Sequence, residues 1–138
     1  MIRDYTKTDI DAINEIGKLI KEDFANVYKI FELNKDYANI YVYTKDNKVI
    51  GFLQYENHYE ITDIINIAVA NYCQNKGIGE ELINYLINNT QADKIMLEVR
   101  ENNVYAINLY NKCGFIEINR RKKYYDGEDA IIMERKIS

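Results

Sequence analysis

The chain has 138 residues, of which 47% are hydrophobic, and its formal net charge is −4. This length suits one packed core, so we expect a single domain over residues 1–138. The negative charge argues against direct binding of nucleic acid, and no apolar run is long enough to cross a bilayer. The basic run 120–123 is interpreted as the solvated edge of a strand. We therefore expect a cytoplasmic protein that binds neither nucleic acid nor a membrane.

The first third of the chain is predicted to form one strand and two helices. A short strand is expected over 2–5. Thr8, with Asp11 three residues on, is a candidate N-cap for a helix that runs to about Glu22. A second helix is expected over about 27–33. The apolar residues that recur at helical spacing in the first helix are Ile10, Ile13, Ile16, Leu19 and Ile20.

The rest of the chain alternates between strands and helices. The expected elements are strands at 38–44, 49–55 and 59–69, a helix at 77–90, a strand at 94–99, a helix at 103–113, and strands at 115–125 and 130–136. The order is β-α-α-β-β-β-α-β-α-β-β. This order predicts an α/β fold of the α+β type, in which about four helices pack on a mixed, mostly antiparallel sheet of about seven strands.

Cysteine and histidine are scarce in this chain. Cys73 and Cys113 form no C-x-x-C pair, which favours free thiols in a reducing compartment over a disulfide scaffold. His58 is the single histidine, so a zinc site lacks ligands and a Ser-His-Asp triad has only one candidate base. We therefore expect no metal site and no histidine-based hydrolase.

A loop containing two glycines, Gln74-Asn75-Lys76-Gly77-Ile78-Gly79, leads from a predicted strand into a helix. The first N–H groups of a helix have no internal partner and carry the positive end of its dipole, so pyrophosphate is a natural ligand there. Gly77 and Gly79 let an anion approach the backbone, and Lys76 adds a positive charge. Leu82 rules out a dinucleotide fingerprint, and a P-loop needs its lysine after the glycines. Taken alone, an ordinary glycine-opened helix remains the better interpretation.

Several segments in sequence order resemble the GNAT acetyltransferase superfamily, and in particular its RimI type, the ribosomal-protein-alanine N-acetyltransferases. The loop 74–79 matches the Q/R-x-x-G-x-G/A motif of that superfamily. Asn66-Ile67-Ala68-Val69 resembles the strand that pairs with the pantetheine of the cofactor. The other matching segments are Leu97-Glu98-Val99-Arg100, Asn103, Leu109-Tyr110-Asn111-Lys112-Cys113-Gly114-Phe115 and Glu128-Asp129-Ala130-Ile131-Ile132-Met133. The match runs from about Ile50 to the C-terminus, and the first third resembles the superfamily only in its element order.

The resemblance implies an enzyme that moves an acetyl group directly from acetyl-CoA to a primary amine. The implied acceptor is the N-terminal α-amino group of a protein such as a ribosomal protein. A small-molecule amine, a lysine side chain and a non-catalytic acyl-CoA-binding module remain as alternatives. Glu80 stands where the family often has a basic residue, so we expect the cofactor loop to bind through backbone N–H groups and Lys76. The implied cofactor-binding residues are Ile67, Ala68, Val69, Gln74, Asn75, Lys76, Gly77, Ile78, Gly79, Glu80 and Asn103.

The same resemblance implies a catalytic base and a catalytic acid, Glu98 and Tyr110. From the sequence alone, Glu98 would be interpreted as a solvated charge at a strand end. Tyr110 has support from helix geometry, because it lies seven residues, about two turns, after Asn103 and so points the same way. A phenol there can protonate a departing thiolate. Tyr124 and Tyr125 resemble a paired tyrosine of the RimI type, which favours a peptide acceptor.

Overall fold

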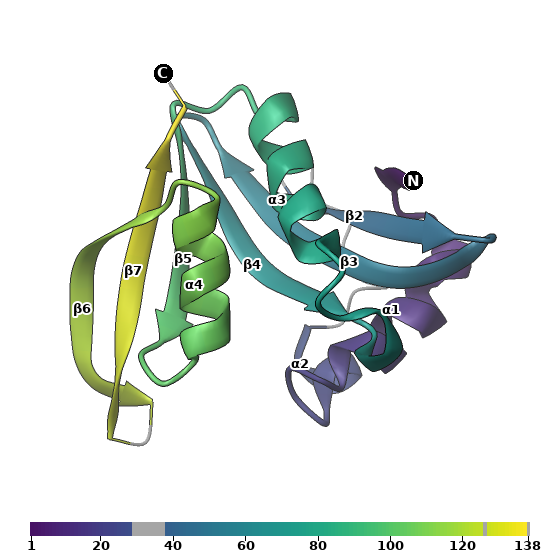
Figure 1. The fold of residues 1–138 in the computed structure, drawn as a ribbon, viewed down its shortest axis with the longest axis horizontal. Coiled ribbons are helices and arrows are strands. Elements are labelled where there is room, and N and C mark those ends of the chain that lie inside the picture. The colour runs from purple at the N-terminus through teal and green to yellow at the C-terminus, as the bar shows by residue number, and fades with distance from the viewer. Residues whose placement is uncertain (29–37, 126, 138) are drawn as a thin grey trace.

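The computed structural model describes residues 1–28, 38–125 and 127–137. In these ranges, seven strands form one sheet in the order β1-β2-β3-β4-β5-β7-β6 (Figure 1). The strands are β1 (Ile2–Asp4), β2 (Ala38–Lys45), β3 (Lys48–His58), β4 (Ile61–Val69), β5 (Lys94–Arg100), β6 (Ile116–Tyr125) and β7 (Glu128–Lys136). The helices are α1 (Ile10–Gly17), α2 (Phe24–Tyr28), α3 (Ile78–Asn89) and α4 (Val104–Lys112). The predicted fold class and element order are confirmed.

The two faces of the sheet are covered unequally. On one face, α3 and α4 pack on β3, β4, β5 and β7 around residues such as Leu53, Leu82 and Ile95. On the other face, α1 and Phe24 of α2 cover the part of the sheet that contains Phe52. β3 is therefore buried on both sides, which explains its near-continuous apolar sequence. β5 instead alternates, with buried residues toward α3 and α4 and exposed charged residues on the opposite face.

Neighbouring strands β4 and β5 separate along their length. They are the one parallel pair in the described sheet, and their pairing ends at Asp63 and Met96, although both strands continue. A register shift against β3 leaves Ile65 without a partner, and such a bulge bends a strand. Beside the bulge, the buried side-chain amide of Asn66 donates a hydrogen bond to Oε1 of Gln54 at 2.8 Å. The bend opens a wedge between β4 and β5, visible in Figure 1.

The first helical segment begins differently from the prediction. A 3-10 turn at Lys7–Asp9 precedes α1. The N–H of Thr6 donates a hydrogen bond to Oδ2 of Asp9 at 2.7 Å, and Asp9 also pairs with Arg3. The predicted N-cap at Thr8 is therefore wrong, because the capping pair lies two residues earlier.

The first helix also ends earlier than predicted, at Gly17 instead of about Glu22. The ring of Phe24 lies 2.3 Å from the point that a Cβ on Gly17 would occupy, so the chain turns back here and packs α2 against α1. As a result Leu19 and Ile20, predicted to lie on the apolar face of the helix, are 46% and 41% exposed.

The second predicted helix, at about 27–33, falls largely outside the described residues. The described helix α2 spans Phe24–Tyr28 and shares only its last two residues with that prediction. Within the described ranges, no helix has both the length and the apolar character that a membrane span requires.

Candidate active site

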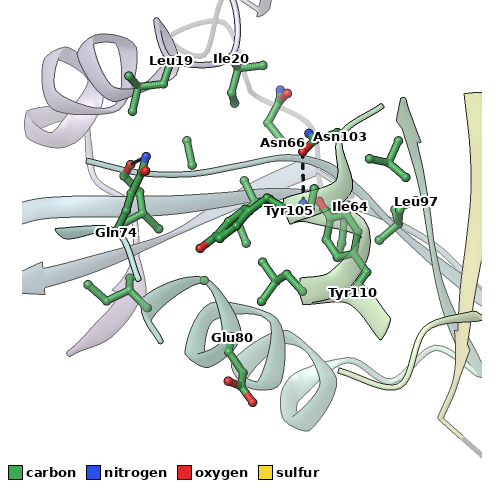
Figure 2. A pocket seen from close by; sticks show the side chains of 18 of the residues that line it. Leu19, Ile20, Ile64, Asn66, Gln74, Glu80, Leu97, Asn103, Tyr105 and Tyr110 are labelled. Carbon is green, nitrogen blue, oxygen red and sulfur yellow. Dashed lines mark hydrogen bonds between the residues drawn. The ribbon is translucent and has the colours of Figure 1, made fainter. Parts of the chain in front are cut away.

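A cavity of about 890 Å³ lies at the wedge between β4 and β5 (Figure 2). It is lined by the second half of β4, the end of β5, the loop before α3, one side of α4, and the segment after α1. The predicted residues that line it are Ile67, Ala68, Val69, Gln74, Asn75, Gly77, Ile78, Gly79, Glu80, Glu98, Asn103 and Tyr110. Lys76, also predicted for this site, is not among the lining residues. The fold thus gathers all but one of the predicted site residues around one space.

The start of α3 presents uncapped backbone donors to this cavity. Gly77 is the N-cap, and no side chain caps the helix. The first hydrogen bond of the helix runs from the N–H of Glu81 to the carbonyl of Gly77 at 3.0 Å. The N–H groups of residues 78–80 have no acceptor within the helix, so a bound anion would satisfy them. Gln74 ties the loop to β4, because its Nε2 donates to the carbonyl of Val69 at 3.2 Å.

The two glycines of the loop have different structural roles. Gly77 has φ of 80°, in the left-handed region, and a Cβ there would meet no atom within 4 Å. Gly79 has ordinary helical geometry, but its Cβ would lie 3.2 Å from Cδ2 of Leu109. The turn into the helix therefore favours glycine at residue 77, and the close approach of the Leu109 side chain favours a small residue at 79.

The carboxylate of Glu80 is directed toward α4. Its Oε2 lies 3.4 Å from Nζ of Lys112, and both residues border the cavity. Figure 2 shows the carboxylate pointing away from Gln74 and Tyr110. The positive charge of Lys112 partly offsets the negative charge of Glu80, which would otherwise repel an anion at the start of α3. The Glu80 side chain itself is an acceptor, so the donors for that anion are the backbone N–H groups.

Tyr110 is a buried phenol on the cavity side of α4. It is 7% exposed, and its ring centroid lies 5.8 Å from that of Phe115. Burial, with a smaller contribution from the charge of neighbouring Cys113, raises the pKa of Tyr110 to about 12. The phenol is therefore protonated at neutral pH and able to donate a proton. Burial also raises the pKa of the Cys113 thiol, which makes that group a poor nucleophile.

Asn103 begins the helix that carries Tyr110. Its Oδ1 accepts a hydrogen bond from the N–H of Ala106 at 3.1 Å, drawn as a dashed line in Figure 2. Asn103 and Tyr110 both border the cavity, as their seven-residue spacing predicts. Since the carbonyl oxygen of Asn103 is used for capping, its amide N–H₂ group is the part that can contact a ligand.

Glu98 reaches the cavity from the other face of the sheet. Its neighbours Leu97 and Val99 are buried toward α3 and α4, whereas the side chain of Glu98 projects to the face with exposed charges. Its Oε1 lies 3.0 Å from Nε of Arg121 on β6. The cavity is thus bordered by a proton donor on one face and a carboxylate on the other, an arrangement suited to two separate proton transfers.

Several cavity residues have no site motif in the sequence. Leu19 and Ile20 carried a misleading pattern, because their helical spacing placed them in the core. Tyr105 could have been found, since it lies one helical turn before Leu109, which lines the same cavity. Figure 2 shows the side chains of Tyr105 and Tyr110 projecting from α4 into the cavity.

Known proteins share both this sequence pattern and this fold. The sequence profile of the Acetyltransferase (GNAT) family matches residues 9–115. An N-alpha-acetyltransferase of Sulfurisphaera tokodaii is 31% identical, over 96% of this chain and 90% of its own. The crystal structure of the ribosomal-protein-S18-alanine N-acetyltransferase from Escherichia coli has a TM-score of 0.87 and 32% identity, and the match covers 100% of this chain and 94% of that one. The chain therefore belongs to the GNAT acetyltransferase family.

A further structural relative contains the co-substrate. A putative streptothricin acetyltransferase of Bacillus anthracis, solved in complex with acetyl coenzyme A, has the same fold at a TM-score of 0.81 and 24% identity, over 100% of this chain and 98% of that one. As a member of the GNAT acetyltransferase family, this chain is an N-acetyltransferase that uses acetyl-CoA. Its residues fit that co-substrate, because the uncapped start of α3 suits a pyrophosphate. The edge of β4 beyond Asp63, which has no strand partner toward β5, suits the amides of pantetheine.

Proposed function

We propose that this enzyme acetylates the N-terminal α-amino group of a protein in the cytoplasm, with a ribosomal protein as the candidate substrate. The observation that carries the proposal is that Glu98 and Tyr110 border one cavity from opposite faces of the sheet. The names of two relatives support the same acceptor, since one is an N-alpha-acetyltransferase and the other acts on an alanine of a ribosomal protein.

Glu98 is the base of the proposed reaction. An α-ammonium group has a reference pKa of about 7.7–8.0, against about 10.4 for lysine, so a carboxylate can remove its proton directly or through a water molecule. The neutral amine then attacks the thioester carbonyl that acetyl-CoA supplies, and a C–N bond forms. The amine approaches from the exposed face of β5, where Glu98 lies.

Tyr110 is the acid of the proposed reaction. As the C–S bond breaks, the phenol donates its proton to the departing sulfur, and solvent later restores that proton. The transfer is direct, so Cys73 and Cys113 take no part. Both are buried free cysteines.

The remaining site residues hold the two substrates. The N–H groups of residues 78–80 bind the pyrophosphate, and residues 67–69 of β4 pair with pantetheine. The amide of Asn103 contacts the cofactor, and Lys76 adds a long-range positive charge. On the acceptor side, the exposed apolar side chains of Leu19 and Ile20 favour a peptide over a strongly hydrated polyamine.

A panel of peptides with free and blocked N-termini tests the acceptor. Wild-type enzyme should acetylate only free N-termini, and mass spectrometry should place the acetyl group on the first residue. Glu98→Gln should lower transfer by about 100-fold, in the range of a lost general base, and retain acetyl-CoA binding measured by calorimetry. Acetylation of blocked peptides at lysine, or of small amines at equal rates, would contradict the N-terminal assignment.

A further inference from the structure

Arg121 connects strand β6 to the proposed base. Its Nε lies 3.0 Å from Oε1 of Glu98, at ion-pair distance, across the intervening strand β7. In the sheet register, Arg121 lies opposite Ala130 of β7, and Glu98 lies opposite Ile132. These four residues project to the same face, because Ala130 and Ile132 are two residues apart on one strand. The guanidinium therefore passes over β7 to reach the carboxylate.

The other charged groups of this region have different partners. Arg100, on the same face of β5 as Glu98, has a guanidinium nitrogen 3.9 Å from Oε2 of Glu128. Arg120, next to Arg121 in sequence, pairs with Glu101, Glu117 and Asp129. The basic run 120–123 is therefore more than the solvated edge that its sequence suggested, because two of its arginines bind separate sets of carboxylates.

The contact between Arg121 and Glu98 suits a base that must be held in place and still react. It is made through Nε of the guanidinium and Oε1 of the carboxylate. A carboxylate has about four lone-pair sites on its two oxygens, so one ion-pair contact leaves room for a proton from an ammonium group or from a water molecule. Without an anchor, a side chain at the end of a strand would sample several rotamers.

We propose that Arg121 is a positioning residue. It holds the carboxylate of Glu98 in one orientation on the exposed face of β5, from which the amine is proposed to approach. The proposal rests on the proposed role of Glu98 as the base. Arg121 touches no reacting atom in this scheme and acts through Glu98. It reaches Glu98 from β6, which lies two strands away in the sheet, so the base depends on an element far from the cofactor loop.

A double-mutant cycle tests this proposal with the 138-residue chain. Arg121→Gln should lower kcat on an acceptor peptide about tenfold, as expected when a reacting group is misplaced, and leave the Kd for acetyl-CoA within about twofold. Arg121→Lys should recover most of the loss, since one charged donor is enough for a one-oxygen contact. In a Glu98→Gln background, Arg121→Gln should have no further effect. Lys123→Gln removes the same charge from the same strand and should leave kcat unchanged.

The cycle separates failure of this proposal from failure of the proposed function. If Glu98→Gln leaves turnover unchanged, Glu98 is not the base and both fail. If Glu98→Gln lowers turnover but Arg121→Gln has the same effect in both backgrounds, the positioning role is wrong and the base assignment stands. The side chain of Arg121 is 57% exposed, so the variants should melt near the wild-type temperature. Should Arg121→Gln fail to fold, Arg121→Met takes its place in the same cycle, and additivity there would overturn the proposal equally.

Discussion

The cofactor side and the acceptor side of the cavity are built in different ways. The proposed cofactor side includes one continuous segment, residues 74–80, which lines the cavity except at Lys76 and offers backbone N–H groups at the start of α3. The proposed acceptor side consists of side chains from separate elements, among them Leu19 and Glu98, and Arg121 pairs with Glu98 from outside the cavity lining. A site made from the backbone of one segment tolerates many side chains, whereas a site made from distant side chains depends on the tertiary structure that brings them together.

Each side of the cavity has an ion pair, and the two pairs differ in where their carboxylates point. On the cofactor side, Glu80 and Lys112 join two helices, and the carboxylate of Glu80 points away from Gln74 and Tyr110. On the proposed acceptor side, Glu98 and Arg121 pair on the face of the sheet from which the amine is proposed to approach. Removing the first pair should therefore change affinity for acetyl-CoA slightly, and removing the second should change turnover.

Loss of the proposed acid, Tyr110, should have the largest effect on turnover and little effect on binding of acetyl-CoA. Tyr110→Phe should lower kcat by about 100-fold or more and change the Kd for acetyl-CoA by less than about threefold. The ring remains, so its packing on Phe115 is kept. Steady-state kinetics and calorimetry on the same preparations measure both quantities. Unchanged turnover would remove Tyr110 as the acid.

The pH dependence of kcat in the wild type and in Tyr110→Phe gives a second test of the role of Tyr110. Burial raises the pKa of Tyr110 to about 12, so the phenol keeps its proton well above neutral pH. Ionisation of Tyr110 should therefore cause no loss of wild-type kcat between about pH 7 and about pH 10. A fall in kcat centred at about pH 9, absent from Tyr110→Phe, would show that the phenol titrates in this range and would contradict the role of burial.

The difference between the two sides also explains what the sequence could predict. The loop 74–79 and the helix face shared by Asn103 and Tyr110 depend on local spacing, and the structure places them together as expected. The contact between Glu98 and Arg121 depends on how β6 and β5 register across β7, which no local pattern encodes. The position of one cofactor-side residue, Lys76, outside the cavity lining likewise depends on the detailed path of its loop.

The first helix, α1, also shows that a local sequence pattern does not encode tertiary contacts. Periodic apolar residues correctly predicted a helix, but the helix ends at Gly17, where the ring of Phe24 packs against the backbone. That contact turns Leu19 and Ile20 out of the helix, so two residues with a core pattern become part of the cavity wall. Periodicity reports which residues are apolar, and it does not report where tertiary packing stops the helix.

An intermediate effect is expected from the partly buried ion pair that ties β1 to the turn before α1. Nη1 and Nη2 of Arg3 donate to Oδ2 and Oδ1 of Asp9 at 2.7 and 3.0 Å, and the carboxylate is buried. Asp9→Asn should lower the free energy of unfolding by about 2 kcal/mol, as for hydrogen bonds to a charged group, measured by urea denaturation. Because α1 leads to Leu19, the KM for peptide should rise more than the Kd for acetyl-CoA.

The pH dependence of this stability difference follows from the pKa of Asp9. The hydrogen bonds from Arg3 lower that pKa in the folded state. The stabilisation is therefore complete above the unfolded value of about 3.9 and is lost as the pH falls through the lower folded value. Wild type and Asp9→Asn should converge on acidification. Glu15→Gln, which breaks an exposed pair with Lys18, should cost less than about 1 kcal/mol, and an equal loss in both variants would show that burial of Asp9 is unimportant.

The smallest effect should come from substitution of Glu80. The change in the Kd for acetyl-CoA tests whether the cofactor is bound by backbone N–H groups or by side chains. Glu80→Gln removes a negative charge near the N–H groups that face the pyrophosphate, so acetyl-CoA should bind about two- to threefold more tightly at low salt, as for a partly exposed charge pair. The gain should shrink near about 1 M salt, where the screening length falls to about 3 Å. Glu81→Gln, in the same helical turn but beside Tyr43, is the matched control and should change the Kd less. Weaker binding by Glu80→Gln would mean that its carboxylate, or the Lys112 that it orients, contacts the cofactor directly, and recognition by the backbone alone would then be wrong.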